Sequence, residues 1–187
     1  MRVKETTRKE IEQKFLEMND YLRMEYLKDC LKNQLDFDTK KFVLVKLAGL
    51  YETKGMLLEA GKMMKAAGEI NTSVAAKISD FVKAVELYIR GGDFDSADAM
   101  KKKAVAIAPL EKQTEIERMV REYYKIQAKV FVDGSKRRQA AGFYEKLLMM
   151  NLDSSEKREV QEELLKIYEG LGDFNRSRNL RRKVFNE

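Results

Sequence analysis

FVKAVELYIRGGDFDSADAMKKKAVAIAP, residues 81–109, is the stretch that decides the fold. Apolar residues recur at helical spacing before and after the Gly-Gly-Asp sequence at 91–93, and Pro109 ends the stretch. Glycine permits a tight reversal of the chain, whereas proline cannot continue a helix without removing a hydrogen bond. The pattern therefore predicts two amphipathic helices, at 74–90 and 94–108, that form a helical hairpin.

The composition favours a chain that is helical almost throughout. Its 187 residues include 10 glycines and 1 proline, and 44% are hydrophobic, which is enough apolar surface for a core. Similar patterns surround the central hairpin and are separated by short polar or glycine-containing breaks. Helices are therefore predicted at residues 4–19, 21–35, 41–53, 56–69, 74–90, 94–108, 111–132, 136–150, 156–170 and 174–185.

The residues of the central hairpin recur at matching positions elsewhere in the chain. Tyr51, Tyr88 and Tyr168 each precede a turn glycine, and a small residue such as Ala60 or Ala97 follows in the next helix. In stacked hairpins the tyrosines would fill the space between neighbouring units, and the alanines would let two helices cross closely. The recurrence therefore predicts an array of similar hairpins.

This pattern resembles the tetratricopeptide repeat (TPR) family, whose unit is a helical hairpin of about 34 residues with the sequence W-x2-L-G-x2-Y, then A-x3-F, then P. The resemblance covers roughly residues 41–187 and extends only loosely to 5–37. The chain departs from the family pattern because it has no Trp, because its units are longer, and because Lys101 and Arg181 stand at aromatic positions.

The resemblance implies an all-α fold, a right-handed α-solenoid of about five antiparallel helical hairpins. We expect one TPR-like domain over residues 1–187. Within it, residues 1–37 would form a degenerate N-terminal hairpin and residues 38–187 four TPR-like hairpins. Another solenoid of helical hairpins is the alternative architecture.

No pattern in the chain indicates catalysis, a cofactor or a metal. Histidine, the commonest general base and metal ligand, is absent. The single Cys30 lies on a predicted helix, which favours a structural thiol. Asp93, Asp95 and Asp98 lack the glycine and distal glutamate of an EF-hand loop, so helix capping is the better interpretation. We therefore predict a protein that is not an enzyme, with no catalytic, cofactor-binding or metal-binding residue.

The resemblance also implies a binding surface, because the first helix of each TPR hairpin lines an inner groove that holds a peptide or a helix of a partner. We therefore predict a protein-interaction scaffold or adaptor. The lysine-and-asparagine clamp of chaperone-binding members is not reproduced, so a C-terminal acidic peptide is not implied in this groove. The partner-binding residues that the resemblance implies are Phe42, Val45, Glu86, Arg90, Lys125, Lys129, Glu162 and Lys166, with Glu52, Val82, Glu122, Glu159 and Glu169 beside them.

Association with RNA or DNA is the alternative function. The formal net charge is +6, and basic residues gather on predicted second helices at 101–103, 136–138 and 176–183. These runs lack interleaved exposed aromatic residues, and consecutive charges point around a helix instead of along one face. A surface of mixed charge is therefore favoured. An affinity that falls steeply between low and moderate salt would indicate nucleic-acid binding.

The sequence also supports expectations about location and self-association. No apolar run approaches the about 20 residues that span a bilayer, and the N-terminus lacks a signal-peptide core. With a single cysteine, this predicts a soluble, cytoplasmic protein without a membrane partner. The apolar Leu180, Val184 and Phe185 have no further helix to cover them, which predicts a homodimer, or a partner, at the last helix.

Overall fold

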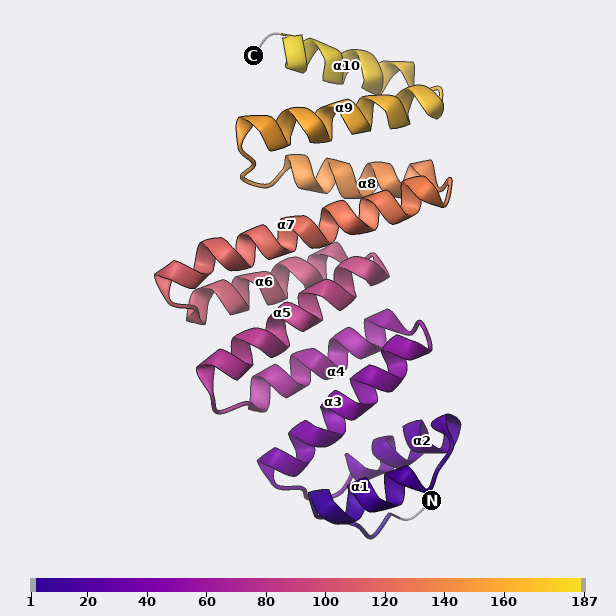
Figure 1. The fold of residues 1–187 in the computed structure, drawn as a ribbon, viewed down its shortest axis with the longest axis vertical. Coiled ribbons are helices and arrows are strands. Elements are labelled where there is room, and N and C mark those ends of the chain that lie inside the picture. Colours follow the sequence, from indigo (N-terminus) through magenta and orange to yellow (C-terminus); the bar gives the residue numbers. More distant parts are fainter. Residues whose placement is uncertain (1–2, 186–187) are drawn as a thin grey trace. The chain divides into compact units, whose positions relative to one another are not determined.

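The computed structural model describes residues 3–185, except for the side chains of Asp20 and of residues 183–185. Within this range the chain forms ten α-helices and no strand (Figure 1), which confirms the predicted all-α fold. The helices are α1 (Arg8–Leu16), α2 (Asp20–Cys30), α3 (Phe37–Thr53), α4 (Leu57–Ile70), α5 (Val74–Gly91), α6 (Phe94–Ile107), α7 (Leu110–Asp133), α8 (Arg137–Leu148), α9 (Ser154–Gly170) and α10 (Phe174–Phe185).

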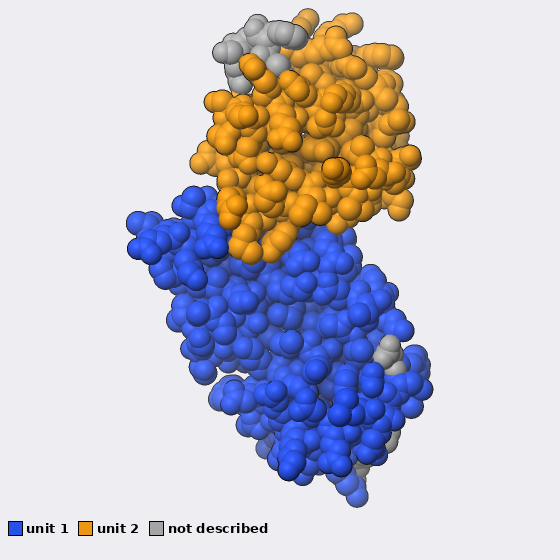
Figure 2. Space-filling view, in the orientation of Figure 1, with its two compact units in different colours: residues 1–117 blue, residues 118–187 orange. Residues whose placement is uncertain are grey.

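The helices belong to two compact units, Met1–Glu117 and Arg118–Glu187, and the division falls within α7 (Figure 2). In the first unit each helix from α2 to α5 packs against the next one in sequence, so that the packed series runs from α2 to α6. In the second unit α8 packs on α9, and α9 packs on α10. Each unit is therefore a stack of antiparallel helical hairpins, as the α-solenoid prediction requires. The assignment of the whole chain to one domain stays a prediction.

Side chains that accept hydrogen bonds from backbone amides set where the helices begin. The side chains of Asn19, Ser73 and Asp153 cap α2, α5 and α9, as the polar breaks in the sequence predicted. Helix α3 begins at Phe37 instead of at the predicted residue 41. Asp36 is the cap, because its Oδ1 accepts from the Thr39 amide at 2.9 Å and its Oδ2 accepts from the Thr39 hydroxyl at 2.6 Å.

The first hairpin is shorter than the sequence pattern predicted. The α1 helix ends at Leu16 and α2 ends at Cys30, instead of at residues 19 and 35. After Cys30 the amides of Lys32 and Asn33 bond to carbonyls only three residues back, which tightens the backbone and ends the helix.

The turn glycines and the tyrosines between neighbouring hairpins have the predicted roles. Gly92, at the C-terminus of α5, has a φ of 80°, a left-handed conformation that costs other residues about 1–2 kcal/mol. Gly55 and Gly172 share it. The side chains of Tyr88 and Tyr168 are buried, and so is that of Ala97 in the first turn of α6.

A second glycine requirement comes from the close packing of α4 on α5. A Cβ placed on Gly68 would lie 2.7 Å from two atoms of the Phe81 ring, and one placed on Gly61 would lie 2.9 Å from the Tyr88 ring. The absence of both side chains therefore lets the two rings approach the backbone of α4.

A buried polar pair fixes the turn between α4 and α5. The amide Nδ2 of Asn71 donates to Oδ2 of Asp80 at 2.8 Å, and both residues are less than 10% exposed. The Lys41 ammonium of α3 lies 3.6 Å from the same carboxylate oxygen. The sequence pattern identified Asn71 only as part of a polar stop, so this pair was not predicted.

Candidate partner-binding site

In the first unit, three of the predicted groove residues take part in a cluster of four charges. Glu52 of α3 and Lys83, Glu86 and Arg90 of α5 form it: Lys83 and Arg90 each bond to Glu86 at 3.0 Å, and Arg90 also pairs with Glu52. Burial alone would raise the pKa of the Glu52 carboxyl, but hydrogen bonds from Arg90 and Lys83 outweigh it and lower that pKa. A ligand at Glu86 or Arg90 would therefore have to compete with bonds inside the protein.

The other predicted residues of this unit differ in how open they are. The Phe42 ring is partly covered, with the Arg8 guanidinium 4.8 Å and the Lys46 ammonium 5.5 Å from its centre. Val45 is exposed, at 39%. Val82, which was expected in the groove, is 7% exposed, and this expectation is wrong because the residue lies on the core face of α5.

In the second unit, the structure brings three predicted residues, Lys125, Lys129 and Glu159, together at a pocket of about 170 Å³, which we call the groove pocket. Lys125 and Lys129 lie one turn apart on α7, and between them Ile126 is 59% exposed. Helices α7 and α9, the first helices of their predicted hairpins, supply most of the lining. The lining residues are Lys125, Ile126 and Lys129 of α7, Tyr144 of α8, and Glu159, Val160 and Glu163 of α9.

Charged groups on α7 and α9 pair beside this pocket. The Lys125 ammonium lies 2.9 Å from Oε1 of Glu156, and the Arg121 guanidinium lies 3.5 Å from Oε2 of the same residue. The hydrogen bond from Lys125, together with both positive charges, lowers the pKa of the Glu156 carboxyl although partial burial opposes this. Lys125 therefore serves first to join α7 to α9, whereas the more exposed Lys129 is better placed for a partner.

The remaining predicted residues, Glu162 and Lys166, are exposed on α9 but do not line the groove pocket. The Lys166 ammonium pairs with Glu163 at 2.6 Å. Sequence reasoning did not identify Ile126, Tyr144, Val160 or Glu163. An apolar Ile126 outside the core stripe of Val120, Tyr124 and Ala128 was the signal that could have indicated the first of them.

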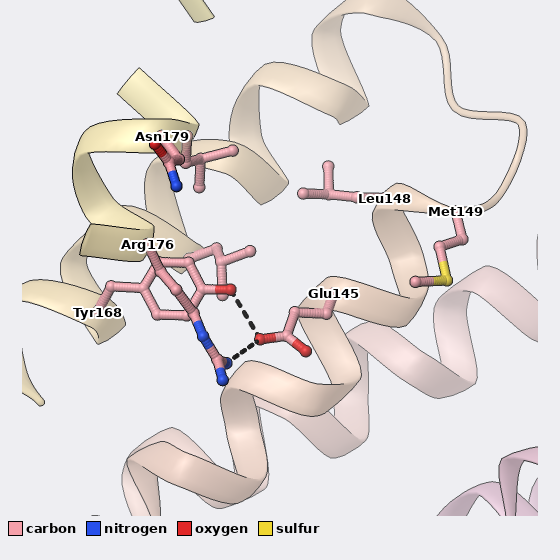
Figure 3. Close-up of a pocket in the computed structure, with 8 residues that line it drawn as sticks. Glu145, Leu148, Met149, Tyr168, Arg176 and Asn179 are labelled. Atoms are coloured by element: carbon pink, nitrogen blue, oxygen red, sulfur yellow. Dashed lines mark hydrogen bonds and ion pairs between the residues drawn. The ribbon is translucent and has the colours of Figure 1, made fainter. Parts of the chain in front are cut away.

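A second pocket, of about 530 Å³, lies among α8, α9 and α10, and we call it the α8–α10 pocket. One carboxylate joins the three helices there: Oε1 of Glu145 accepts from the Tyr168 hydroxyl at 2.7 Å and from the Arg176 guanidinium at 3.0 Å (Figure 3). Sequence reasoning named none of these as site residues. The lining residues are Glu145, Leu148, Met149, Leu164, Tyr168, Arg176, Asn179 and Leu180.

Burial and the bond to Glu145 change the acidity of Tyr168. Burial, followed by the hydrogen bond to the Glu145 carboxylate, raises the pKa of the Tyr168 phenol to about 12 from an ordinary value of 10.0. Because the folded state holds this proton more tightly than the unfolded state does, the associated stability is present below pH 10.0 and is lost as the pH rises through about 12.

Replacing Tyr168 by phenylalanine is therefore expected to lower the free energy of unfolding at neutral pH by about 1.5 kcal/mol, since a hydrogen bond to a carboxylate is lost. The variant should also lose less stability than the parent when the pH is raised from 9 to 12. Urea unfolding over this pH range measures both effects. The exposed Tyr21→Phe is the matched control, and an equal alkaline loss in the parent and in Tyr168→Phe would contradict this assignment.

The expected dimer contact at the last helix falls partly outside the described residues. Leu180 is 9% exposed and lines the α8–α10 pocket. The side chains of Val184 and Phe185 lie outside the described residues. Self-association through this helix stays a prediction.

Several residues of the basic runs pair with acids on neighbouring helices. Lys103 of α6 bonds to Glu69 of α4 at 2.7 Å, and Arg181 of α10 pairs with Glu169 of α9. Arg178 and Arg182 of α10 are exposed. Nucleic-acid association stays a prediction, with fewer unpaired cations to support it than the runs alone indicated.

The described residues contain neither a membrane-spanning helix nor a cluster of metal ligands. None of the helices that the structure describes combines the length and hydropathy needed to cross a bilayer. Among these residues there is also no group of three or more Cys, Asp or Glu side chains arranged to hold a metal ion.

Comparisons with known proteins assign neither a family nor a function to the chain. No protein-family model and no curated protein matches the chain. The crystal structure of BtubC (BKLC) from P. vanneervenii is similar at 15% sequence identity and a TM-score of 0.40, over 95% of this chain and 79% of that one. The crystal structure of the MamA protein is similar at 16% identity and a TM-score of 0.40, over 94% and 86%. At this similarity no function is carried over to the chain.

Proposed function

We propose that the protein is a non-enzymatic scaffold that binds a peptide or a helix of a partner protein in the groove between α7 and α9. The observation that carries the proposal is the groove pocket, where an exposed isoleucine lies between charges of both signs. Ile126 is 59% exposed there, between Lys129 on α7 and Glu159 and Glu163 on α9. An apolar anchor within a polar rim is the usual arrangement of a protein-binding surface.

The size of the groove pocket favours a peptide over a small molecule. Its volume of about 170 Å³ is below the roughly 300–1,000 Å³ of most small-molecule sites. It is enough for one or two apolar side chains, which would rest on Tyr144 and Val160 at its floor. Both of these residues are buried and therefore held in place by the core.

The second unit supports this proposal more strongly than the first. The predicted groove residues Glu86 and Arg90 bond to neighbouring side chains, and Phe42 lies beneath Arg8 and Lys46. In contrast, Ile126 and Lys129 are exposed. We therefore expect the first contact of a partner at α7 and α9. We further propose that the scaffold acts in the cytoplasm, because a single, buried thiol such as that of Cys30 is compatible with a reducing compartment.

Selection from a random-peptide display library on the immobilised protein tests the proposal. Peptides with an apolar anchor should be enriched, and Ile126→Asp should weaken their binding about tenfold or more, because the aspartate places a charge in the apolar contact. Ile107→Asp, at an exposed isoleucine on α6, is the matched control and should leave binding unchanged. Binding is measured by fluorescence anisotropy of the selected peptides.

Two outcomes would contradict the groove proposal. One is that selected peptides bind equally well to the parent and to Ile126→Asp. The other is that no peptide is enriched while an RNA oligonucleotide binds and loses affinity steeply between low and moderate salt, which would indicate the alternative function.

A further inference from the structure

The α8–α10 pocket has a partly apolar lining, and none of its lining residues belongs to the groove pocket, although α8 and α9 contribute to both. No residue of α7 lines it. In Figure 3, Leu148 at the end of α8 and Met149 directly after it lie across the opening from Asn179 on α10, and Glu145 and Arg176 meet at one end of the opening. Its volume of about 530 Å³ is large enough for several side chains of a bound segment.

Matching positions in the first unit show why this pocket is open. The α4–α6 sequence aligns with α8–α10 on Tyr88 and Tyr168, so that Gly68 matches Leu148 and Phe81 matches Gln161. In the first unit the Phe81 ring fills the space over Gly68. The second unit has no aromatic ring at the matching position, and its α8 carries a leucine there instead of the glycine.

The rim of the pocket is apolar, whereas the matching surface of the first unit carries an ion pair. In the first unit Glu69 bonds to Lys103 at 2.7 Å, and that ammonium also lies 5.7 Å from the centre of the Phe81 ring. Met149 occupies the position that matches Glu69, and it is 79% exposed. The contacts that close the surface in the first unit are therefore replaced by an exposed, flexible apolar side chain.

The helix on the other side of the pocket carries positive charge only. All the charged residues of α10, whose sequence is FNRSRNLRRKVF, are basic. Arg176 and Arg181 pair with Glu145 and Glu169, respectively, whereas Arg178 and Arg182 are exposed. Arg182 follows Asn179 by three residues, so the two are neighbours on the surface of the helix, and Arg178 lies one turn before Arg182. A positive stripe therefore borders the apolar opening.

We propose that the α8–α10 pocket is a second binding site, which takes an acidic segment of a partner protein that inserts an apolar side chain. The anchor would lie against Leu148, Leu164 and Leu180, and Met149 would adapt to cover it. Carboxylates next to the anchor would meet Arg178 and Arg182. This inference does not depend on the groove between α7 and α9.

Charge and shape together favour a protein segment over other anionic partners. Phosphates of a nucleic acid would contact the arginines but leave the concave apolar surface of Leu148 and Leu164 unfilled. A membrane would need a protruding apolar face, whereas Leu164 and Leu180 are buried at the bottom of a pocket. The Glu145 carboxylate would also orient the ligand. It would repel the acidic groups of the ligand from the α8 side of the pocket, so that these groups lie on the α10 side.

Nuclear magnetic resonance of protein labelled at the methionine methyl groups tests this inference. The probe is an acidic peptide of about twelve residues, long enough for three helical turns, with leucines at helical spacing among glutamates. We expect it to shift the Met149 methyl signal saturably. The signal is assigned with the Met149→Leu variant. Two control peptides, one with alanine for leucine and one with lysine for glutamate, should not shift it.

Variants on both sides of the pocket locate the site. Arg178→Glu/Arg182→Glu should weaken binding of the acidic peptide about tenfold, and Lys102→Glu/Lys112→Glu, at exposed lysines of the first unit, is the charge-matched control. Met149→Asp, at a side chain too exposed to support the core, should also abolish binding. Ile126→Asp should leave it unchanged, which separates this site from the groove pocket.

Four results would overturn the proposal. The acidic peptide could leave the Met149 signal unmoved, its affinity could be unaffected by both Met149→Asp and the arginine variant, or a uridine oligonucleotide or phosphatidylserine vesicle could bind through Arg178 and Arg182 while the peptide does not. If the signal instead shifts with protein concentration alone, a second copy of the chain occupies the site and the partner proposed here is wrong.

Discussion

Replacing Gly68 by alanine is expected to lower the free energy of unfolding by about 2 kcal/mol, because forcing extra atoms into a packed core costs about 3 kcal/mol and the higher helix propensity of alanine offsets about 1 kcal/mol of this. The new Cβ would lie 2.7 Å from two ring atoms of Phe81, which is closer than such atoms approach in proteins. The ring is 4% exposed and has little room to move. This cost exceeds the about 1 kcal/mol by which alanine favours a helix over glycine. Urea unfolding followed by circular dichroism measures the change.

The control for this prediction is the same substitution at Gly49 on α3. No atom outside the immediate backbone lies within 4 Å of a Cβ placed there, so only helix propensity changes. Gly49→Ala should therefore raise the free energy of unfolding by about 1 kcal/mol. Phe81→Leu in the Gly68→Ala background should recover part of the loss, because it removes the ring that the methyl group meets. If Gly68→Ala and Gly49→Ala change the free energy of unfolding in the same direction, the packing described for α4 and α5 is contradicted.

Replacing Asn71 by alanine is expected to cost about 2–3 kcal/mol, because it leaves a buried carboxylate without its hydrogen-bond donor. Asp80 is 8% exposed and accepts from Asn71 at 2.8 Å, and its other charged neighbour, Lys41, is 3.6 Å away. The loss should appear as a lower urea midpoint for the first unit, together with faster amide hydrogen exchange at the turn between α4 and α5.

Two further variants separate the buried pair from a general effect of the turn. Asn151→Ala, at an exposed asparagine after α8, should change stability by no more than about 0.5 kcal/mol. In an Asp80→Asn background, Asn71→Ala should cost less than it does in the parent, since no buried charge remains to be satisfied. Strictly additive losses would show that the two side chains do not act as a pair.

The helices were predictable because their signals are local. Apolar spacing, capping residues such as Ser73 and Asp153, and the left-handed turn at Gly92 each act within a few residues of the chain. The errors occurred where a local pattern is weak. At the end of α2, leucines continue the helical spacing to residue 35, although the backbone tightens into a turn after Cys30.

The binding surface was less predictable, because it depends on contacts between residues far apart in the sequence. Spacing placed Glu86 and Arg90 in a groove, but it could not show that Glu52, on another hairpin, bonds to Arg90. The α8–α10 pocket was missed for the same reason. The pocket is open because Gln161 and Met149 stand where the first unit has Phe81 and Glu69. Neither Gln161 nor Met149 belongs to a recognisable motif.

The carboxylate of Glu145 has a consequence for protease sensitivity. Only Ser177 and Leu180 are buried among residues 174–182, so the attachment of α10 depends strongly on polar bonds, from Arg176 to Glu145 and from Ser177 and Arg181 to Glu169. When these bonds open, α10 can separate while α8 and α9 stay folded. An arginine-specific protease would then cleave within α10. A ligand that bridges α8 and α10 would slow this cleavage, because it reduces the fraction of molecules in the open state.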